Sequence, residues 1–187
     1  MESRFSLRAL IVTLMVLGTP AFGTKQAKDS LYQVRSTWTD SSGKKLKLSE
    51  LAGGPVVVAM VYTKCKYTCP LILTKLKSIE KALAEKPATK YVLISFDYKN
   101  DTPAVMKAFM EEKQLDASRW KVLAGQSSGS IREMAALLDT AYKEEKDGEF
   151  SHSNVITLLD QEGVKIAQVN GLAADHSALV AAAKALP

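Results

Sequence analysis

The stretch VVVAMVYTKCKYTCP, residues 56–70, decides the fold of this chain. Its first seven residues are apolar and mostly β-branched, which is typical of a strand buried inside a sheet. Its last residue, Pro70, suits the first turn of a helix, and apolar residues follow at helical spacing as far as Leu83. The stretch therefore predicts a central strand that leads through a short turn into a helix.

The turn between that strand and that helix carries the two cysteines of the chain, Cys65 and Cys69. At the start of a helix, unpaired backbone N–H groups and the positive end of the helix dipole stabilise a thiolate. Two thiols at such a place can bind a soft metal ion, exchange a disulfide with a partner, or form a plain structural disulfide. The function of the chain depends on which of these they do.

Further patterned segments surround this unit and predict the rest of the fold. Asp101 and Thr102 are expected to cap the helix that starts at Pro103, and residues 143–149 are expected to form a charged loop. The order of elements predicts a thioredoxin-like α/β fold with an N-terminal β-hairpin and an extra helical insertion. We expect strands at 30–38, 45–48, 91–96, 120–123 and, as an antiparallel hairpin, 154–159 and 164–169, with helices at 101–113, 130–138 and 174–186.

The spacing of the cysteines differs from that of thioredoxins, which use C-x-x-C. Three residues separate Cys65 from Cys69, so the two sulfurs can meet at one ion and can still close into a disulfide. By softness, two thiolates suit Cu(I), Zn(II) or an iron–sulfur cluster, but a four-thiolate cluster cannot be built from two cysteines in one chain. A bound metal therefore needs a further ligand.

The chain offers two histidines as that further ligand, His152 and His176. In a thioredoxin-like fold, the loop before the strand at 154–159 packs beside the cysteine helix, so His152 can reach the thiols. His176 begins the last predicted helix, away from that corner, and is expected to be a surface or capping residue.

The first 23 residues have the pattern of a secretory signal peptide. Two arginines precede the apolar stretch 9–17, and the small residues Ala21 and Gly23 follow it. The stretch is shorter than the about 20 residues that a membrane span needs, and an uncleaved anchor is the alternative. We expect a single domain at 24–187 that is exported to the periplasm, or anchored and facing the periplasm, where two cysteines can pair.

The composition indicates the kind of surface that this domain presents. The net charge of +5 comes from 25 basic and 20 acidic residues, and the lysines are spread along the chain beside the acids. This balance is typical of a solvated, mildly basic surface and predicts no nucleic-acid partner.

Several motifs, in order along the chain, resemble those of the Sco/SenC family. The resemblance extends over essentially the whole domain, from Trp38 to the C-terminus. The motifs are Cys65-x-x-x-Cys69-Pro70, then Ser95-Phe96-Asp97-x-x-x-Asp101-Thr102-Pro103, and later His152 ahead of Leu158-Leu159-Asp160-x-x-Gly163.

The resemblance implies a thioredoxin-like fold and a site for copper, as Cu(I) or Cu(II), formed by Cys65, Cys69 and His152. It also implies that Asp97 lies near this site without being a ligand. Members of the family deliver copper, or reducing equivalents, to the binuclear copper site of cytochrome c oxidase outside the cytoplasm. The implied partners are the oxidase subunit that carries this site, other copper carriers and a thiol reductase.

The alternative function is an extracytoplasmic thiol–disulfide oxidoreductase that uses Cys65 and Cys69 as its redox pair, with one thiol attacking a partner disulfide and the other resolving it. A thiol peroxidase fits less well, because it needs an activating arginine, and Arg119 and Arg132 lie outside the motif loops. One departure from the family pattern bears on this choice. Many members have Pro-Asp-Val between the cysteines, where this chain has Lys66-Tyr67-Thr68, and the change favours free thiolates.

Overall fold

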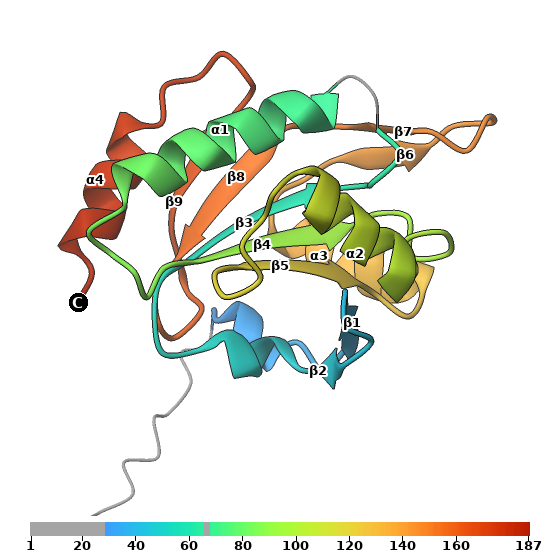
Figure 1. Ribbon diagram of the computed structural model, residues 1–187, viewed down its shortest axis with the longest axis horizontal. Helices are drawn as coiled ribbons and strands as arrows, with labels where there is room; N and C mark the ends of the chain where they lie inside the picture. Colours follow the sequence, from blue (N-terminus) through green and yellow to red (C-terminus); the bar gives the residue numbers. More distant parts are fainter. Residues whose placement is uncertain (1–28, 66–67) are drawn as a thin grey trace, which may run out of the picture.

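The computed structural model describes residues 29–65 and 68–187, so the predicted signal peptide lies outside the described residues. Figure 1 shows a central sheet with helices packed on it. Seven strands of the described chain form this sheet in the order β2-β1-β5-β4-β3-β8-β9, and β6 and β7 form a separate two-stranded sheet. The strands are β1 (Trp38–Asp40), β2 (Lys45–Leu46), β3 (Val56–Val61), β4 (Lys90–Ser95), β5 (Trp120–Ala124), β6 (Tyr142–Glu144), β7 (Phe150–His152), β8 (Val155–Leu159) and β9 (Lys165–Asn170).

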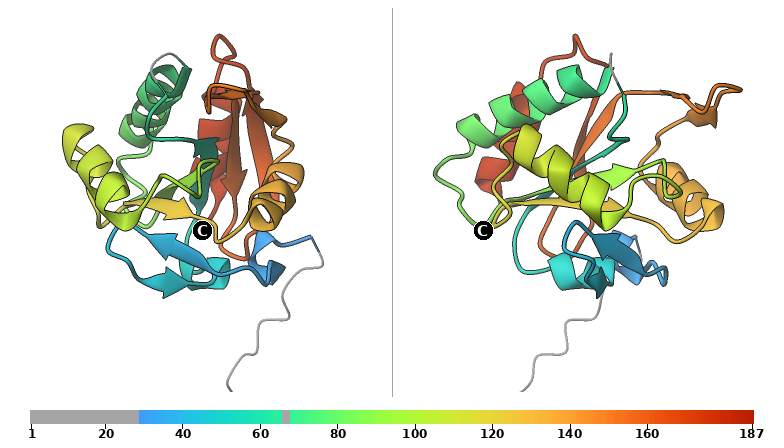
Figure 2. Two further views of the ribbon diagram at one scale, coloured as in Figure 1. Left: turned by 90° about the vertical axis from the view of Figure 1, so that its right-hand side faces the viewer. Right: turned by 45° about the vertical axis from the view of Figure 1, so that its right-hand side comes forward.

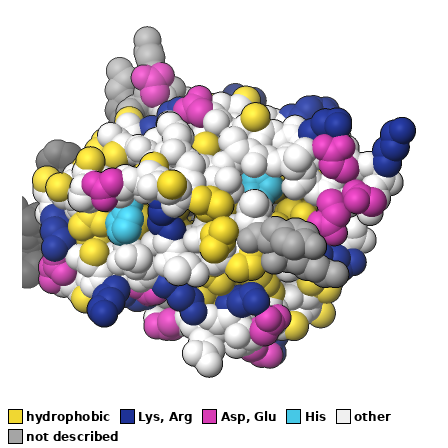
Figure 3. Space-filling model, turned by 90° about the horizontal axis from the view of Figure 1, so that it is seen from above, with side chains coloured by type: hydrophobic (Ala, Val, Ile, Leu, Met, Phe, Trp, Pro, Cys, Tyr) yellow, Lys and Arg dark blue, Asp and Glu magenta, His cyan; other side chains and the backbone are white. Residues whose placement is uncertain are grey.

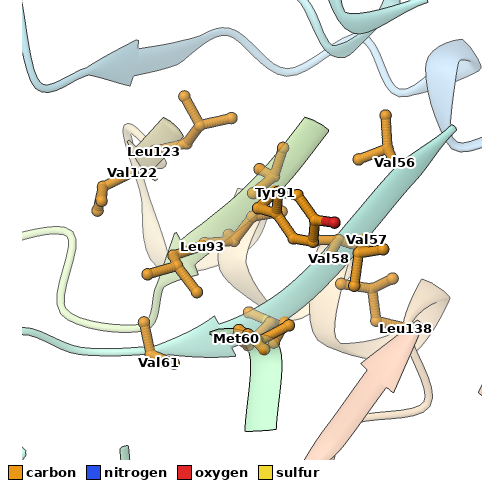
Figure 4. Close-up of a cluster of buried hydrophobic side chains, with 14 of the residues drawn as sticks. Val56, Val57, Val58, Met60, Val61, Tyr91, Leu93, Val122, Leu123 and Leu138 are labelled. Carbon is orange, nitrogen blue, oxygen red and sulfur yellow. The ribbon is translucent and has the colours of Figure 1, made fainter. Parts of the chain in front are cut away.

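The centre of the main sheet is parallel and buried on both faces. Strand β4 pairs in parallel with β3 and β5, while β8 pairs antiparallel with β3. All six residues of β3 are buried, which explains its unbroken apolar sequence. Figure 4 shows part of the core, with labelled side chains from β3, β4 and β5 and Leu138 from the end of a helix. The predicted antiparallel hairpin before the last helix is confirmed as β8 and β9.

Of the four α-helices in the described residues, three cover one face of the sheet, and α3 covers the other (Figure 2). Helix α1 lies between α2 and α4 and contacts both. Lys77 of α1 donates a hydrogen bond to the carbonyl of Lys113, directly after α2 (2.6 Å). Glu85, after the end of α1, forms an ion pair with Lys184 of α4 (2.8 Å). Among the described residues, no helix combines the length and apolar character that a membrane crossing requires. The helices are α1 (Thr68–Ala82), α2 (Pro103–Glu112), α3 (Ser128–Leu137) and α4 (Ser177–Ala185).

The predicted strand at 30–38 is wrong over most of its length. Leu31–Gln33 form a 3-10 helix, whose N-cap Ser30 accepts a hydrogen bond from the N–H of Tyr32 (3.1 Å). Leu31 and Tyr32 are neighbours and both are buried. In a strand they would point to opposite faces, whereas a tight helical turn packs both into one core. The predicted strand at 45–48 is also shorter, because Leu48–Leu51 form a second 3-10 helix.

The expectation of a loop at 143–149 is wrong in part, because a hairpin occupies this region. Strands β6 and β7 flank a shorter connection, and Tyr142 pairs with His152 in their register. The hairpin projects away from the main sheet (Figures 1 and 2). From its end the chain runs almost directly into β8, so the hairpin fixes where His152 lies relative to the core.

Candidate metal centre

The two cysteines lie where β3 passes into α1. The N–H of Cys65 donates to the carbonyl of Tyr62 (3.3 Å), which closes the turn after the strand. Cys69 is the second residue of α1, and its N–H donates to the sulfur of Cys65 (3.4 Å). Cys65 and Cys69 are not joined by a disulfide; Cys65 is half-buried, whereas Cys69 is only 4% exposed. Cys65 is therefore the more accessible thiol, and Cys69 lies behind it.

His152 ends β7 and faces the buried thiol. Its Nε2 lies 3.8 Å from the sulfur of Cys69, and its Nδ1 lies 3.0 Å from the carbonyl oxygen of Ser153. Because a carbonyl oxygen only accepts hydrogen bonds, this contact keeps the proton of the neutral ring on Nδ1. The lone pair of Nε2 is then free to bind a metal ion on the side of Cys69.

The three predicted ligands come together in the structure. Cys65, Cys69 and His152 each offer one ligand atom, and all three atoms lie within 4.8 Å of one another. In the described part of the chain, no other group of three histidine, cysteine or acidic side chains converges in this way. Residues 65 and 152 are 87 positions apart, so folding, rather than local sequence, makes this group.

Burial dominates the electrostatics of the site. It raises the pKa of the Cys69 thiol, against a hydrogen bond with the backbone of Tyr62. Burial therefore opposes, at this cysteine, the thiolate that the start of a helix favours. Burial also lowers the pKa of His152, against its hydrogen bond to Ser153, so the ring is neutral at pH 7. A metal ion entering the site meets a neutral imidazole and must displace the proton of Cys69.

Two aromatic rings lie against His152, two more pack on those rings, and no sequence motif indicates them. The ring of Phe96, after β4, lies 5.0 Å from that of His152, and the ring of Tyr62, after β3, lies at 6.4 Å. Phe150 packs edge-on against Tyr62 at 5.2 Å, and Tyr142 stacks on Phe96 at 5.0 Å. These rings come from four segments of the chain. Only a prediction of strands at Tyr142–Glu144 and Phe150–His152 could have indicated that Tyr142, Phe150 and His152 share one face of a hairpin.

Asp101 holds the loop that carries Cys65, which corrects its expected role as a helix cap. The residue is 1% exposed, and its carboxylate accepts hydrogen bonds from the N–H of Thr63 (3.0 Å), from the Thr63 hydroxyl and from the Ser95 hydroxyl. Burial raises the pKa of Asp101, against these hydrogen bonds. Thr102 is the cap of α2, since its hydroxyl accepts from the N–H of Val105 (3.4 Å).

Asp97 follows β4 and is buried, but its carboxylate is engaged locally. It accepts hydrogen bonds from the backbone N–H of Asn100 (3.1 Å) and from the side-chain amide of the same residue (2.9 Å). A role for Asp97 beside a bound metal stays a prediction. His176 occupies the N-cap position of α4 without a capping hydrogen bond from its side chain, and its Nε2 lies 3.4 Å from the hydroxyl of Ser78 on α1.

The face above α1 is apolar near its middle and charged around its edge (Figure 3). Leu71, two residues after Cys69, is 55% exposed, more than any other large apolar side chain of the described chain. Lys66 and Tyr67, which replace the usual residues of the family between the cysteines, lie outside the described residues.

Comparison with known proteins identifies the family of this chain. A family model described as SCO1/SenC matches residues 24–186 of the chain. The chain belongs to the SCO1/SenC family. A sequence search among curated proteins finds no match.

Solved structures of SCO1/SenC proteins share the fold. A SCO1/SenC family lipoprotein from Bacillus anthracis is 24% identical, with a TM-score of 0.73 over 80% of this chain and 91% of that one. ScoI of Bradyrhizobium japonicum, solved with copper bound, is 24% identical, with a TM-score of 0.67 over 81% and 97%. BsSco, described with a disulfide switch and as a member of the Sco family of cytochrome c oxidase assembly proteins, is 24% identical, with a TM-score of 0.68 over 79% and 88%. The fold that the resemblance implied is confirmed.

Proposed function

We propose that this SCO1/SenC protein is an exported copper-binding accessory protein. It delivers copper to the binuclear copper site of cytochrome c oxidase, or prepares the thiols of that site. The observation that carries the proposal is the convergence of Cys65, Cys69 and His152 within 4.8 Å. The copper bound to the ScoI relative, and the assembly role printed for the BsSco relative, support it.

The donor set and its spacing suit a copper ion. Two thiolates and one imidazole are soft and borderline ligands, which Cu(I) prefers over carboxylates. Ligand atoms of this kind bind at about 2.0–2.3 Å, so three of them around one ion lie about 3.5–4 Å apart. The Cys69–His152 distance of 3.8 Å already meets this requirement. The half-buried Cys65 then offers the side from which a partner's ligands can take over the ion.

A Cu(I) titration of the reduced domain, without oxygen and against a competing chelator, tests the proposal. We expect one tightly held copper per chain, with affinity that weakens as the pH falls, because the ligands must be deprotonated. His152→Ala should lose most of the affinity. The matched control is His176→Ala, since His176 is the second histidine and contacts Ser78 instead of the thiols. Equal affinity in both variants would refute the three-ligand site.

The second candidate function is that of a thiol–disulfide reductase. The arrangement of the pair favours it, because the half-buried Cys65 can attack a partner disulfide while the buried Cys69 waits behind it. The test is reaction with a disulfide peptide copied from an oxidase copper site. Cys69→Ser should then trap a mixed disulfide through Cys65, and His152→Ala should slow the reaction without abolishing it. If the chain binds copper through His152 and does not reduce the peptide, delivery of copper is the function.

The proposed function lies outside the cytoplasm. The signal-peptide pattern of residues 1–23 and the lipoprotein among the relatives support this placement. Cell fractionation followed by N-terminal sequencing tests it. We expect a periplasmic chain that begins near Thr24; a full-length chain in the cytoplasmic fraction would contradict the placement.

A further inference from the structure

We propose that Tyr62 is a positioning residue of the copper site. Its hydroxyl holds the β6–β7 hairpin against the end of β3, and thereby keeps His152 within reach of Cys69. The inference rests on the proposed function, because it assigns a role in copper binding to a residue that is not a ligand.

Tyr62 contacts the hairpin through both its hydroxyl and its ring. It is 4% exposed, and its hydroxyl donates a hydrogen bond of 2.5 Å to Oε2 of Glu149, the residue directly before β7. Its ring packs edge-on against Phe150, with 5.2 Å between the centroids, and lies 6.4 Å from the ring of His152. Residues 149, 150 and 152 of the hairpin region thus all contact or face one side chain.

The hairpin depends on such contacts for its placement. Its strands pair only with each other and not with the main sheet, and an isolated two-stranded hairpin is marginally stable in water. Besides the Cys69–His152 contact, the polar side-chain contacts that tie residues 142–152 of the described chain to the body are those of the Tyr62 hydroxyl with Glu149 and with the backbone of Phe150, and the Lys99–Glu144 pair. The Lys99–Glu144 pair is more than half exposed on both sides, and such pairs contribute little.

Tyr62 also touches the cysteine loop, so one residue joins both halves of the site. Its carbonyl accepts the N–H of Cys65 at 3.3 Å. A binding site keeps its geometry when the residues that support its ligands are themselves held by packing and hydrogen bonds. Tyr62 meets this condition, since its backbone is anchored at the end of the central strand and its ring is packed under the hairpin.

The test compares Cu(I) affinity and hairpin opening in four variants. Tyr62→Phe removes only the hydroxyl, and Glu149→Leu removes the acceptor. Both should weaken Cu(I) binding about tenfold, the lower end of the range for partners of metal ligands. Glu149→Gln keeps an acceptor oxygen, and Tyr142→Phe removes a hydroxyl from the neighbouring ring. Both controls should bind within about twofold of the wild type.

A readout without metal separates positioning from general destabilisation. In the metal-free protein, hydrogen exchange of the amides of residues 150–153 should speed up in Tyr62→Phe and Glu149→Leu, while the exchange of β3 and β4 stays unchanged. In a His152→Ala background, Tyr62→Phe should bring a smaller loss of copper affinity than in the wild-type background, because the tie to Glu149 acts through His152 and only the contact of the Tyr62 hydroxyl with Cys65 remains to be lost.

The outcomes distinguish the two proposals. If the wild type binds no copper, the proposed function fails, and hydrogen exchange alone still decides whether Tyr62 holds the hairpin. The inference would be overturned if Tyr62→Phe kept both the Cu(I) affinity and the hydrogen-exchange rates of the wild type. It would also be overturned if Tyr62→Phe lost as much Cu(I) affinity in the His152→Ala background as in the wild-type background. Should Tyr62→Phe fold poorly, the Glu149→Leu and Glu149→Gln pair decides between the outcomes, since Glu149 is exposed.

Discussion

The carboxylate of Asp101 accepts hydrogen bonds from both the backbone N–H and the hydroxyl of Thr63, 38 residues earlier in the chain. Thr63 lies two residues before Cys65, and Asp101 directly precedes the cap of α2. The loop that presents the thiols is therefore held from outside, by a buried acidic side chain on another segment. This contact suggests the first two predictions.

Asp101→Ala should lower the free energy of unfolding by at least about 2 kcal/mol. The substitution leaves the N–H of Thr63 and two hydroxyls without their acceptor, and each buried group left unsatisfied costs about 1–3 kcal/mol. Urea unfolding followed by far-UV circular dichroism measures the loss. Glu111→Ala is the control, because Glu111 is exposed and makes only a 4.0 Å ion pair with Lys107. A loss as small as that of the control would mean that the contact is not made in solution.

Asp101 should also give the stability of the protein a distinct pH dependence. Burial raises its pKa in the folded state above the ordinary value of 3.8. Between the unfolded-state pKa of 3.8 and the higher folded-state pKa, Asp101 holds a proton in the folded protein that it has lost in the unfolded protein. The free energy of unfolding therefore falls as the pH rises through this window. In measurements from about pH 3.5 to pH 7, the advantage of the wild type over Asp101→Asn should therefore shrink as the pH rises above 3.8 and through the folded-state pKa of Asp101. Urea unfolding at intervals across this range measures the difference, and an advantage that grows with pH would show that the hydrogen bonds outweigh burial.

The two thiols should differ in reactivity. Cys65 is half-buried and lies in the turn before α1, whereas Cys69 is 4% exposed and burial raises its pKa. Because the thiolate is the nucleophile, Cys65 should be alkylated at least about tenfold faster than Cys69 in the reduced, metal-free protein. Mass spectrometry of Cys69→Ser and Cys65→Ser treated with iodoacetamide gives the two rates. In urea the rates should become similar, and the same similarity in the native protein would refute the prediction.

Two leucines on α1 form a matched pair that tests its packing. Leu76 is 1% exposed and Leu71 is 55% exposed. Leu76→Ala should lower the free energy of unfolding by about 2–5 kcal/mol, as for other buried leucines. Leu71→Ala should change it by less than about 0.5 kcal/mol. Thermal and urea unfolding compare the two, and equal losses would mean that α1 is rotated relative to the sheet.

The sequence predicted most of the core because the core follows local patterns. The apolar run of β3 and the helical spacing of α1 each occur within one element, and both elements are where they were expected. The errors lie where local pattern and tertiary packing disagree. Leu31 and Tyr32 enter one core through a tight turn instead of a strand, and Tyr142 and Phe150 turn an expected loop into a hairpin by packing their rings on Phe96 and Tyr62.

By itself, the sequence determined the order of strands and helices, the placement of two thiols at a helix start, and the set of residues able to bind a soft metal. These follow from periodicity, residue chemistry and spacing, which act over a few residues. Only the tertiary structure decided that His152 meets Cys69, that Asp101 supports Thr63 instead of capping its own helix, and that Tyr62 meets Glu149. Each of these pairs joins segments 38 or more residues apart. An acidic, hydroxyl or aromatic side chain can contact a sequence neighbour or a residue on a distant segment. Only the packing of the folded chain selects which of these contacts is made.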